Sequence, residues 1–455
     1  MSHENEIPDV AVIGAGGAGL LAGIAAARAG ARTVLYERMK TAARKVAISG
    51  GGRCNFTNTL DARQFVRLFG DKNSGHLGHS LRVFSNQDVI DMLAQYGVEG
   101  QVEKNYRLYT KSGRGGDVVN ALVAEFKKAG GTMIPQARIV SVKRAPDTAG
   151  GAENHFILEG KFGDFDEQHK ARTVIVCTGG MSYPVTGSTG DGYAWAREFG
   201  HKVTELRPAL VGLAVVEEWT RTLQGLAWPD AQVALWPMPD AASLNKPKSG
   251  KPICTERAEI LYTHFGISGP AILDVSNAFV GHGLRKAQLV VDYFPDLRRE
   301  ELDAQLQERF KQYPNRLLAR ALDGMMPSRL LEFLEKTINA MAPKEEPAVV
   351  CRLPKASRMK LLDSLKNTVL TVNGTRGIEF GEVTAGGIVW DEIDPVRLES
   401  KLQPGLFFAG EILDLTGRCG GFNLQAAFST GYLAGQKAAE RARAQAVSLQ
   451  PKTSQ

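Results

Sequence analysis

Three glycines near the N-terminus have the spacing of a turn that binds a dinucleotide. Gly14, Gly16 and Gly19 follow a short apolar run, Asp9 to Ile13, and precede a segment of small residues, Leu20 to Ala29. In a strand–turn–helix unit of this kind, the first glycine permits a tight bend and the second lets the backbone approach a pyrophosphate. The third lets the helix pack closely on the strand. The N-terminus of that helix then faces the phosphate charge.

An acid that completes such a site stands at the end of the next apolar run. Glu37 follows Ala31 to Tyr36 and lies 23 positions after Gly14. This is near the spacing of about 20 residues at which an acid binds ribose hydroxyls. A structural turn without a ligand is the alternative interpretation of any glycine-rich segment. Because strand, helix and acid all stand in place here, the sequence favours a bound dinucleotide, carried by parallel strands with a helical crossover.

The positive charge of the chain is concentrated just after this unit. The formal net charge is +6, and the segment from Arg38 to Arg53 contains five basic residues and no acid. The stretch from 205 to 355, by contrast, has 19 basic and 19 acidic residues. A basic excess focused on one loop favours a phosphorylated small molecule, whereas an excess spread over a domain is typical of nucleic-acid binding.

A second glycine-rich segment, Ser49 to Asn58, combines backbone freedom with hydrogen-bonding side chains, as a ligand cradle requires. Together with Arg44-Lys45 it resembles the signature loop of the BaiN/YhiN-like (RdsA-like) NAD(P)/FAD-dependent oxidoreductases. The resemblance covers residues 9 to 435. It continues in four further motifs: Thr178-Gly179-Gly180 with Ser182 to Tyr193, Leu261 to Pro270, Val383 to Gly387 with Gly405 to Asp414, and Gly420 to Gln425.

The resemblance implies FAD as the cofactor and assigns residues to it. The glycine turn and Glu37 hold the ADP half, Ile139 offers backbone to adenine, and the helix opening at Gly421 faces the pyrimidine edge of the flavin. There the helix N-terminus stabilises the negative charge of reduced flavin. The full set of implied FAD-binding residues is Gly14, Gly16, Gly17, Ala18, Gly19, Glu37, Arg38, Lys45, Ser49, Gly50, Gly51, Arg53, Cys54, Asn55, Thr57, Ile139, Thr178, Gly179, Gly180, Gly410, Glu411, Gly420, Gly421, Phe422, Asn423 and Leu424.

No catalytic acid can be identified from the sequence, and four residues are candidates. Cys54 and Cys419 each follow an arginine in loops that should border the flavin, either as a redox pair or, the favoured interpretation, as small packing residues. His264 is a site acid or a structural histidine, and Tyr183 is a further polar candidate. The five cysteines lie at least 68 positions apart, so neither a metal site nor a disulfide framework is expected.

Length and composition set the expected architecture. A chain of 455 residues with 43% apolar and 23% charged residues is a globular protein of more than one domain. We expect an α/β fold: a Rossmann-like FAD-binding domain with a central parallel sheet, split by a β-barrel-like plus helical insertion. The expected segments are 1–204 and 356–435 for the two parts of the FAD-binding domain, 205–355 for the insertion, and 436–455 for a polar tail.

The family resemblance implies a reductase that passes hydride from reduced FAD to an electron-poor C=C bond of a small, enone-like molecule. Alternatives are a ribosomal RNA dihydrouridine synthase, an aminoacetone-type amine oxidase and a non-catalytic flavin sensor. The chain has a single glycine turn of the dinucleotide type, so NADPH or NADH either docks transiently as electron donor or is replaced by another donor. No apolar run reaches the length of about 18 residues that a membrane span needs, and the N-terminus lacks the basic start of a secretory signal. The expected location is the cytoplasm.

Overall fold

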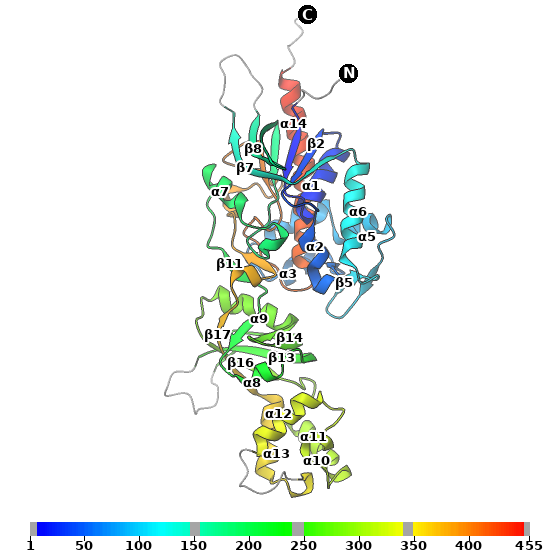
Figure 1. Cartoon of the computed structure of the whole chain (residues 1–455), viewed down its shortest axis with the longest axis vertical. Coiled ribbons are helices and arrows are strands. Elements are labelled where there is room, and N and C mark those ends of the chain that lie inside the picture. The colour runs from blue at the N-terminus through cyan, green and yellow to red at the C-terminus, as the bar shows by residue number, and fades with distance from the viewer. Residues whose placement is uncertain (1–6, 146–154, 239–249, 340–348, 450–455) are drawn as a thin grey trace, which may run out of the picture. The chain divides into compact units, whose positions relative to one another are not determined.

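The computed structural model describes residues 7–145, 155–238, 250–339 and 349–449. They form two compact units (Figure 1). Unit 1 combines the chain up to Pro208 with the chain from Gly381 onward, and unit 2 comprises Ala209–Phe380. The short strands β11 (Arg207–Ala209) and β18 (Val383–Ala385) lie where the chain passes between the units. No helix in the described part of the chain is both long and apolar enough to cross a membrane.

The core of unit 1 is a five-stranded parallel sheet. Its two central strands are buried along their whole length, which explains why they appear in the sequence as continuous apolar runs rather than alternating ones. Val10 of one central strand pairs with Thr173 of the other and with Thr33 on its opposite side. The order across the sheet is β19 (Leu406–Phe408), β10 (Thr173–Val176), β1 (Val10–Ile13), β2 (Thr33–Glu37) and β6 (Thr132–Pro135).

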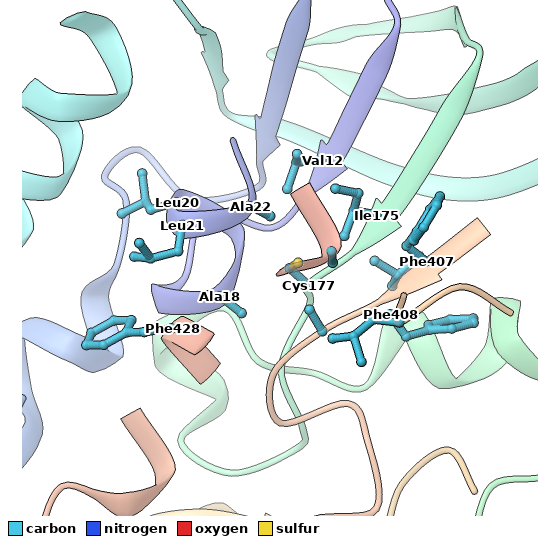
Figure 2. Close-up of a cluster of buried hydrophobic side chains, with 14 of the residues drawn as sticks. Val12, Ala18, Leu20, Leu21, Ala22, Ile175, Cys177, Phe407, Phe408 and Phe428 are labelled. Atoms are coloured by element: carbon cyan, nitrogen blue, oxygen red, sulfur yellow. The ribbon is translucent and has the colours of Figure 1, made fainter. Parts of the chain in front are cut away.

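Two helices pack closely against each other beside this sheet. They are α1 (Gly17–Arg28) and α14 (Phe422–Leu449), drawn in blue and red in Figure 1. The contact is so close that only glycine fits at two positions of α14. A Cβ atom at Gly431 would lie 2.1 Å from the carbonyl oxygen of Ala18, and one at Gly435 would lie 2.1 Å from that of Ala22. Figure 2 shows Ala18 and Ala22 in the buried cluster that this packing creates.

The expected polar tail from residue 436 is wrong for the described residues, because α14 continues to Leu449. Ala438, Ala439 and Ala442 are buried along it. Their spacing places small apolar residues on one face of the helix while charged residues occupy the other. The segment is polar on average, so its composition did not reveal that it forms an amphipathic helix. Residues 450–455 of the expected tail lie outside the described residues.

Smaller elements surround the sheet of unit 1. An antiparallel sheet contains β3 (Asn55–Asn58), β5 (Arg107–Thr110) and β4 (Gly100–Val102), and another contains β7 (Ala137–Arg144), β8 (Phe156–Phe162) and β9 (Phe165–Ala171). Its further helices are α2 (Arg44–Ile48), η2 (Ser49–Gly52), α3 (Ala62–Leu68), η3 (Ser74–His76), α4 (Leu77–Val83), α5 (Asn86–Ala94), α6 (Gly115–Lys128), η4 (Pro184–Thr186), α7 (Asp191–Glu198) and η7 (Trp390–Glu392).

Unit 2 is a closed antiparallel barrel joined to a group of helices, as expected for the insertion. The barrel order is β12 (Leu213–Val215), β15 (Gly266–Ser268), β14 (Cys254–Thr263), β13 (Ala227–Pro237), β16 (Ala287–Asp292) and β17 (Thr368–Thr375), which pairs back to β12. The helices are α8 (Trp219–Thr222), α9 (Pro270–Gly281), α10 (Arg299–Gln312), α11 (Leu318–Ala321), α12 (Ser328–Asn339), η5 (Val350–Arg352), α13 (Lys355–Lys366) and η6 (Ile378–Phe380).

The boundaries of this unit differ from those expected. It runs from Ala209 to Phe380 rather than from 205 to 355. The reason is β17, which follows α13 and closes the barrel between β16 and β12. Barrel closure depends on pairing between strands far apart in the sequence, so the local pattern near residue 355 did not reveal it.

Candidate dinucleotide-binding site

The glycine turn between β1 and α1 has the geometry that the spacing predicts. Gly14 has a φ of +99°, and a Cβ atom there would lie 2.6 Å from the carbonyl oxygen of Cys177. A Cβ at Gly19 would lie 1.8 Å from the carbonyl oxygen of Gly14, so the helix starts in direct contact with the turn. Gly16 differs, because a Cβ there would meet no atom within 4 Å. Its outer side is open for the close approach of a ligand.

The N-terminus of α1 can bind a negatively charged group. No side chain caps this end of the helix, and its first turn contains no acid. The first N–H groups of any α-helix lack partners within the helix, so those of Gly17, Ala18 and Gly19 are available to an anion. The aromatic ring of Phe428 packs against α1 at Gly17, where a Cβ atom would lie 2.8 Å from the ring. Figure 2 shows Phe428 in the buried cluster.

Glu37 lies against this turn at the end of β2. Its Oε2 accepts a hydrogen bond from the Ala15 N–H at 2.8 Å, and its Oε1 accepts one from the Met39 N–H at 2.7 Å. Burial raises the pKa of this carboxyl, while the two N–H groups act in the opposite direction. Each carboxylate oxygen has a second acceptor position, which a ribose hydroxyl can use.

Arg38 and Ile139 lie close to the same end of the sheet. The Arg38 guanidinium donates to the hydroxyl of Thr189 and, at 3.3 Å, to Asp191. Asp191 also faces Arg138 at 3.6 Å, next to the buried Ile139 on β7. Arg38 is therefore already paired with a carboxylate, and its contribution is to join β2 to the segment before α7.

The structure brings together Lys45 and Glu411, which are 366 positions apart in the sequence. The Lys45 ammonium donates to Glu411 Oε2 at 3.0 Å and to Ser182 Oγ at 2.9 Å. Glu411 Oε1 accepts from the Thr384 N–H at 2.8 Å and from Ser182 Oγ at 3.0 Å. Burial by itself raises the pKa of Glu411. Lys45 and these hydrogen bonds outweigh burial and hold that pKa below its ordinary value.

Ser182 and Thr384 were missed as site residues, although both stand in the motifs Ser182-Tyr183-Pro184 and Val383-Thr384-Ala385. Their proximity also explains the adjacent glycine. A Cβ at Gly180 would lie 2.3 Å from Thr384 Oγ1 and 2.9 Å from Glu411 Oε1. The polar cluster of Lys45, Ser182, Thr384 and Glu411 therefore ties α2 to the segments after β10 and β19.

The second glycine-rich loop is held in a left-handed conformation. Gly50, Gly51 and Gly52 have φ values of +56°, +68° and +87°, and Cys54 also has a positive φ, of +54°. A Cβ at Gly50 would lie 2.9 Å from the ring of Tyr109. The Arg53 guanidinium lies over that same ring, 4.1 Å from its centre, and pairs with Glu103 at 2.6 Å.

The hydrogen-bonding residues that follow this loop are used inside the protein. Asn55 Oδ1 accepts from the Leu108 N–H at 3.2 Å, and Thr57 Oγ1 donates to Gln425 Oε1 at 2.6 Å. A Cβ at Gly421 would lie 2.3 Å from the Thr57 carbonyl oxygen, so β3 contacts the start of α14 directly. Asn423 Oδ1 in turn accepts from the Gly417 N–H at 2.7 Å. These side chains shape the loop that precedes α14.

Among the buried polar atoms of unit 1 that have no hydrogen-bond partner among the described residues, two lie beside the predicted motifs. One is Thr178 Oγ1, in the predicted motif after β10, and the other is Arg107 Nε. A Cβ at Gly420 would lie 3.6 Å from Arg107 Nε, which places Arg107 beside the loop before α14. Sequence reasoning missed Arg107, whose signal was only its position next to Tyr109. Unpaired buried donors and acceptors are costly unless a ligand satisfies them.

The remaining predicted residues lie in four places. Gly410 has a φ of +80°, and its Cβ would lie 2.7 Å from that of Ala18, so the segment after β19 reaches the start of α1. Ser49 donates its hydroxyl to the Val46 carbonyl oxygen at 2.8 Å. Gly179 has a φ of +72°, Phe422 packs on Phe65 with ring centres 4.9 Å apart, and Leu424 is half-buried on α14.

The four catalytic candidates are divided between the two units, with Cys54, Tyr183 and Cys419 in unit 1 and His264 in unit 2. Cys54 is buried, and burial raises the pKa of its thiol to about 11. Cys419 is half-buried, and Tyr183 has a φ of +49° with 36% of its surface exposed. His264 belongs to unit 2, where its ring meets the edge of Phe265 with centres 5.1 Å apart. Cys54 is consequently a protonated packing thiol at neutral pH.

The residues present fit an FAD molecule. The helix N-terminus and the open face of Gly16 suit a pyrophosphate, and Glu37 suits a ribose. Thr178 Oγ1 and Arg107 Nε supply an acceptor and a donor that the protein itself leaves unused among its described residues. The glycine turn and Glu37 were expected from local sequence and Thr178 from the family resemblance, whereas the Lys45–Glu411 pair and Arg107 depend on the fold.

Comparison with known proteins shows the family of this chain. The model of the HI0933-like protein Rossmann domain matches residues 8–437. The chain is 30% identical to a ribosomal RNA dihydrouridine synthase of Haemophilus influenzae, over 92% of this chain and 96% of that protein. It is 30% identical to a ribosomal RNA dihydrouridine synthase of Escherichia coli, over 94% and 97% of the two chains. It is 29% identical to a 3-dehydro-bile acid delta(4,6)-reductase of Clostridium scindens, over 95% and 99%.

Solved structures share the fold. A 3-ketosteroid-delta4-(5alpha)-dehydrogenase of Rhodococcus jostii superposes with a TM-score of 0.51 at 16% identity, covering 96% of this chain and 98% of that one. A 3-ketosteroid delta1-dehydrogenase of Sterolibacterium denitrificans gives a TM-score of 0.52 at 12% identity, covering 95% and 99%. The chain therefore belongs to the HI0933-like Rossmann-domain family of FAD-dependent oxidoreductases that the sequence motifs indicated.

Proposed function

We propose that this protein reduces a C=C bond that is conjugated to a carbonyl group. The observation that carries the proposal is the dinucleotide site of unit 1, in a chain that matches relatives along almost their whole length. A dihydrouridine synthase and a delta(4,6)-reductase both add two hydrogens across such a bond. When bound, reduced FAD supplies the hydride for one carbon, and a proton from a side chain or water completes the other carbon.

The residues of this chain hold the cofactor for that reaction. The N–H groups at the start of α1 bind the pyrophosphate, and Glu37 binds the ribose while it fixes the shape of the turn. The Lys45–Glu411 pair holds α2 and the segments after β10 and β19 together beside the site. Arg107 donates from Nε toward the cofactor at the loop before α14. Tyr183, Cys419 and His264 stay candidates for the proton donor.

NADPH or NADH is the proposed source of electrons, and it docks transiently. We expect no second resident nucleotide, since one glycine turn of this type is found in the sequence. The small-molecule enone and the uracil ring share the same reactive group, a C=C bond next to a carbonyl. Both are therefore substrates to be tested with the same enzyme preparation.

The experiment is an anaerobic titration of the purified protein, followed by absorbance. The flavin bands should bleach with NADPH or NADH and recover when a 4-en-3-one steroid or a uridine-containing RNA is added, with two hydrogens gained in the product by mass spectrometry. Rapid recovery in air alone, with peroxide release, would assign the protein to the oxidases instead. A preparation that cannot take up FAD would contradict the assignment of the site.

A further inference from the structure

The charges of unit 2 are segregated, although their sum along the expected insertion is zero. Two segments of its helical part contain basic residues only. The first, Arg309 to Leu322, has four basic residues and no acid, and the second, Val349 to Leu362, likewise has four and none. A count of basic and acidic residues over the whole insertion sums these segments with acidic ones, so the basic segments do not show in the total. The relevant quantity for a charged partner is the local pattern on the surface.

The fold places the two segments side by side. The N–H of Val350 donates to the carbonyl oxygen of Arg316 at 2.9 Å, and the N–H of Cys351 donates to that of Pro314 at 3.0 Å. Leu317 and Val349 also form an isolated β-bridge. The end of α10 and the loop after it therefore contact η5 and the start of α13, which Figure 1 shows within the same group of helices.

Most of the cations on this surface are free to meet a partner. Six of them are exposed and have no ion-pair partner among the described residues. We call these six the basic surface: Lys311, Arg316, Arg320, Arg352, Lys355 and Lys360. Arg358 is different, because it pairs with Asp303 at 2.9 Å. The nearest exposed acids in sequence are Glu308 and Asp323, at the two ends of the first segment, and Asp363, directly after the second, which pairs with Arg299.

An aromatic ring lies within the basic surface. Tyr313 is half-buried between two guanidinium groups, with Arg316 4.6 Å and Arg309 5.8 Å from the centre of its ring. Flat arginine groups on an aromatic ring offer stacking positions for nucleobases, and the surrounding cations suit phosphates. A small phosphorylated ligand would need a concave cradle, whereas these residues extend over the end of α10, the loop after it, α11, η5 and the first half of α13.

We propose that the basic surface binds the backbone of a single-stranded or looped RNA and so docks it on this protein. The inference rests on the proposed function, which it deepens by naming RNA as the substrate class. Each phosphate neutralised on a single strand contributes about −0.7 to the slope of log K against log salt, so six contacts give a slope of about −4. Binding by this surface is therefore strongly salt-dependent.

The test measures binding of a fluorescent uridine-containing RNA oligonucleotide to the FAD-loaded protein by anisotropy, across a range of salt concentrations. The variant Arg316→Gln/Arg352→Gln/Lys355→Gln removes three cations of the basic surface. The control Lys251→Gln/Arg285→Gln/Lys286→Gln removes three exposed cations from the opposite end of β16, away from α10. Loss of three phosphate contacts reduces the slope by about 2, which is an affinity loss of up to about 100-fold at 0.1 M salt. The control should bind like the wild type.

Each outcome decides the proposal. Equal losses in the two triple variants would show that net charge alone acts, and would overturn it. The proposal is also overturned if the wild-type protein binds anionic phospholipid vesicles but no RNA. It is overturned as well if the wild-type protein binds no RNA while it still reduces an enone. In that last case the proposed function survives without this surface. If the basic surface binds RNA and no substrate is reduced, the docking inference stands and the proposed function fails.

Discussion

Replacement of Gly431 by alanine tests how closely the packing of unit 1 is linked to its cofactor site. The added Cβ would lie 2.1 Å from the carbonyl oxygen of Ala18, whereas an ordinary contact of this kind requires more than 3 Å. Helices α1 and α14 would have to separate by about 1 Å, because neither atom lies on a flexible side chain. Overpacking of this kind costs about 1–3 kcal/mol. The gain in helix propensity on replacing glycine by alanine, about 1 kcal/mol, offsets part of that cost.

The Cβ would meet backbone atoms of Ala18, so the cost lies at the upper end of that range. The net expectation is a loss of about 2 kcal/mol, or a fall of a few degrees in the melting temperature. Affinity for FAD should fall as well, because Ala18 stands in the first turn of α1, where the pyrophosphate is expected. Thermal unfolding with and without added FAD measures the first effect, and the flavin content after dialysis measures the second. Gly116→Ala is the matched control, since a Cβ there meets no atom within 4 Å. A Gly431→Ala protein as stable as this control would refute the close contact.

Three further predictions concern the site itself. Glu37→Ala should lower flavin retention, because both the ribose contact and the hydrogen bond to Ala15 are lost; unchanged occupancy in a dialysis assay would mean that the site is misplaced. Cys54→Ser should leave the turnover number and its pH profile unchanged, since the thiol is buried and protonated at neutral pH, and a large loss in a steady-state assay would give Cys54 a catalytic role. The folded-state pKa of Glu411 is depressed below its ordinary value of 4.5, so its pair with Lys45 stabilises the protein above that pH and is lost as the pH falls further. Glu411→Gln should flatten this acid loss in an unfolding titration, and an unchanged acid limb would contradict the assignment.

The parts of the fold that the sequence revealed are those encoded locally. The turn between β1 and α1 depends on three glycines within six positions. Steric contacts exclude a Cβ at Gly14 and Gly19, Gly16 is open on its outer side, and the acid follows 23 positions after Gly14. The buried strands β1 and β10 are continuous apolar runs for the same local reason. Such patterns are legible because the residues that interact are also neighbours in the sequence.

What the sequence did not reveal depends on contacts across long separations. The pair of Lys45 with Glu411 requires the sheet order β19–β10–β1 before the two side chains can meet. The extent of the insertion depends on β17 closing a barrel that begins about 150 residues earlier. Arg107 Nε becomes significant only once the loop before α14 lies beside it. In each case the residue types were visible, but their proximity was not.

The protonation state of the two buried cysteines limits which groups of this protein can carry electrons. Cys54 lies in the loop where a redox thiol would be expected, yet burial raises its pKa to about 11, and its backbone is held at a positive φ against β5. Burial also raises the pKa of Cys177, the residue whose carbonyl oxygen contacts the glycine turn. A thiol relay needs a thiolate that can attack, and these two side chains are protonated packing groups at neutral pH. Neither buried thiol is therefore suited to carry electrons, which leaves this role in the proposed reaction to the cofactor that unit 1 would hold.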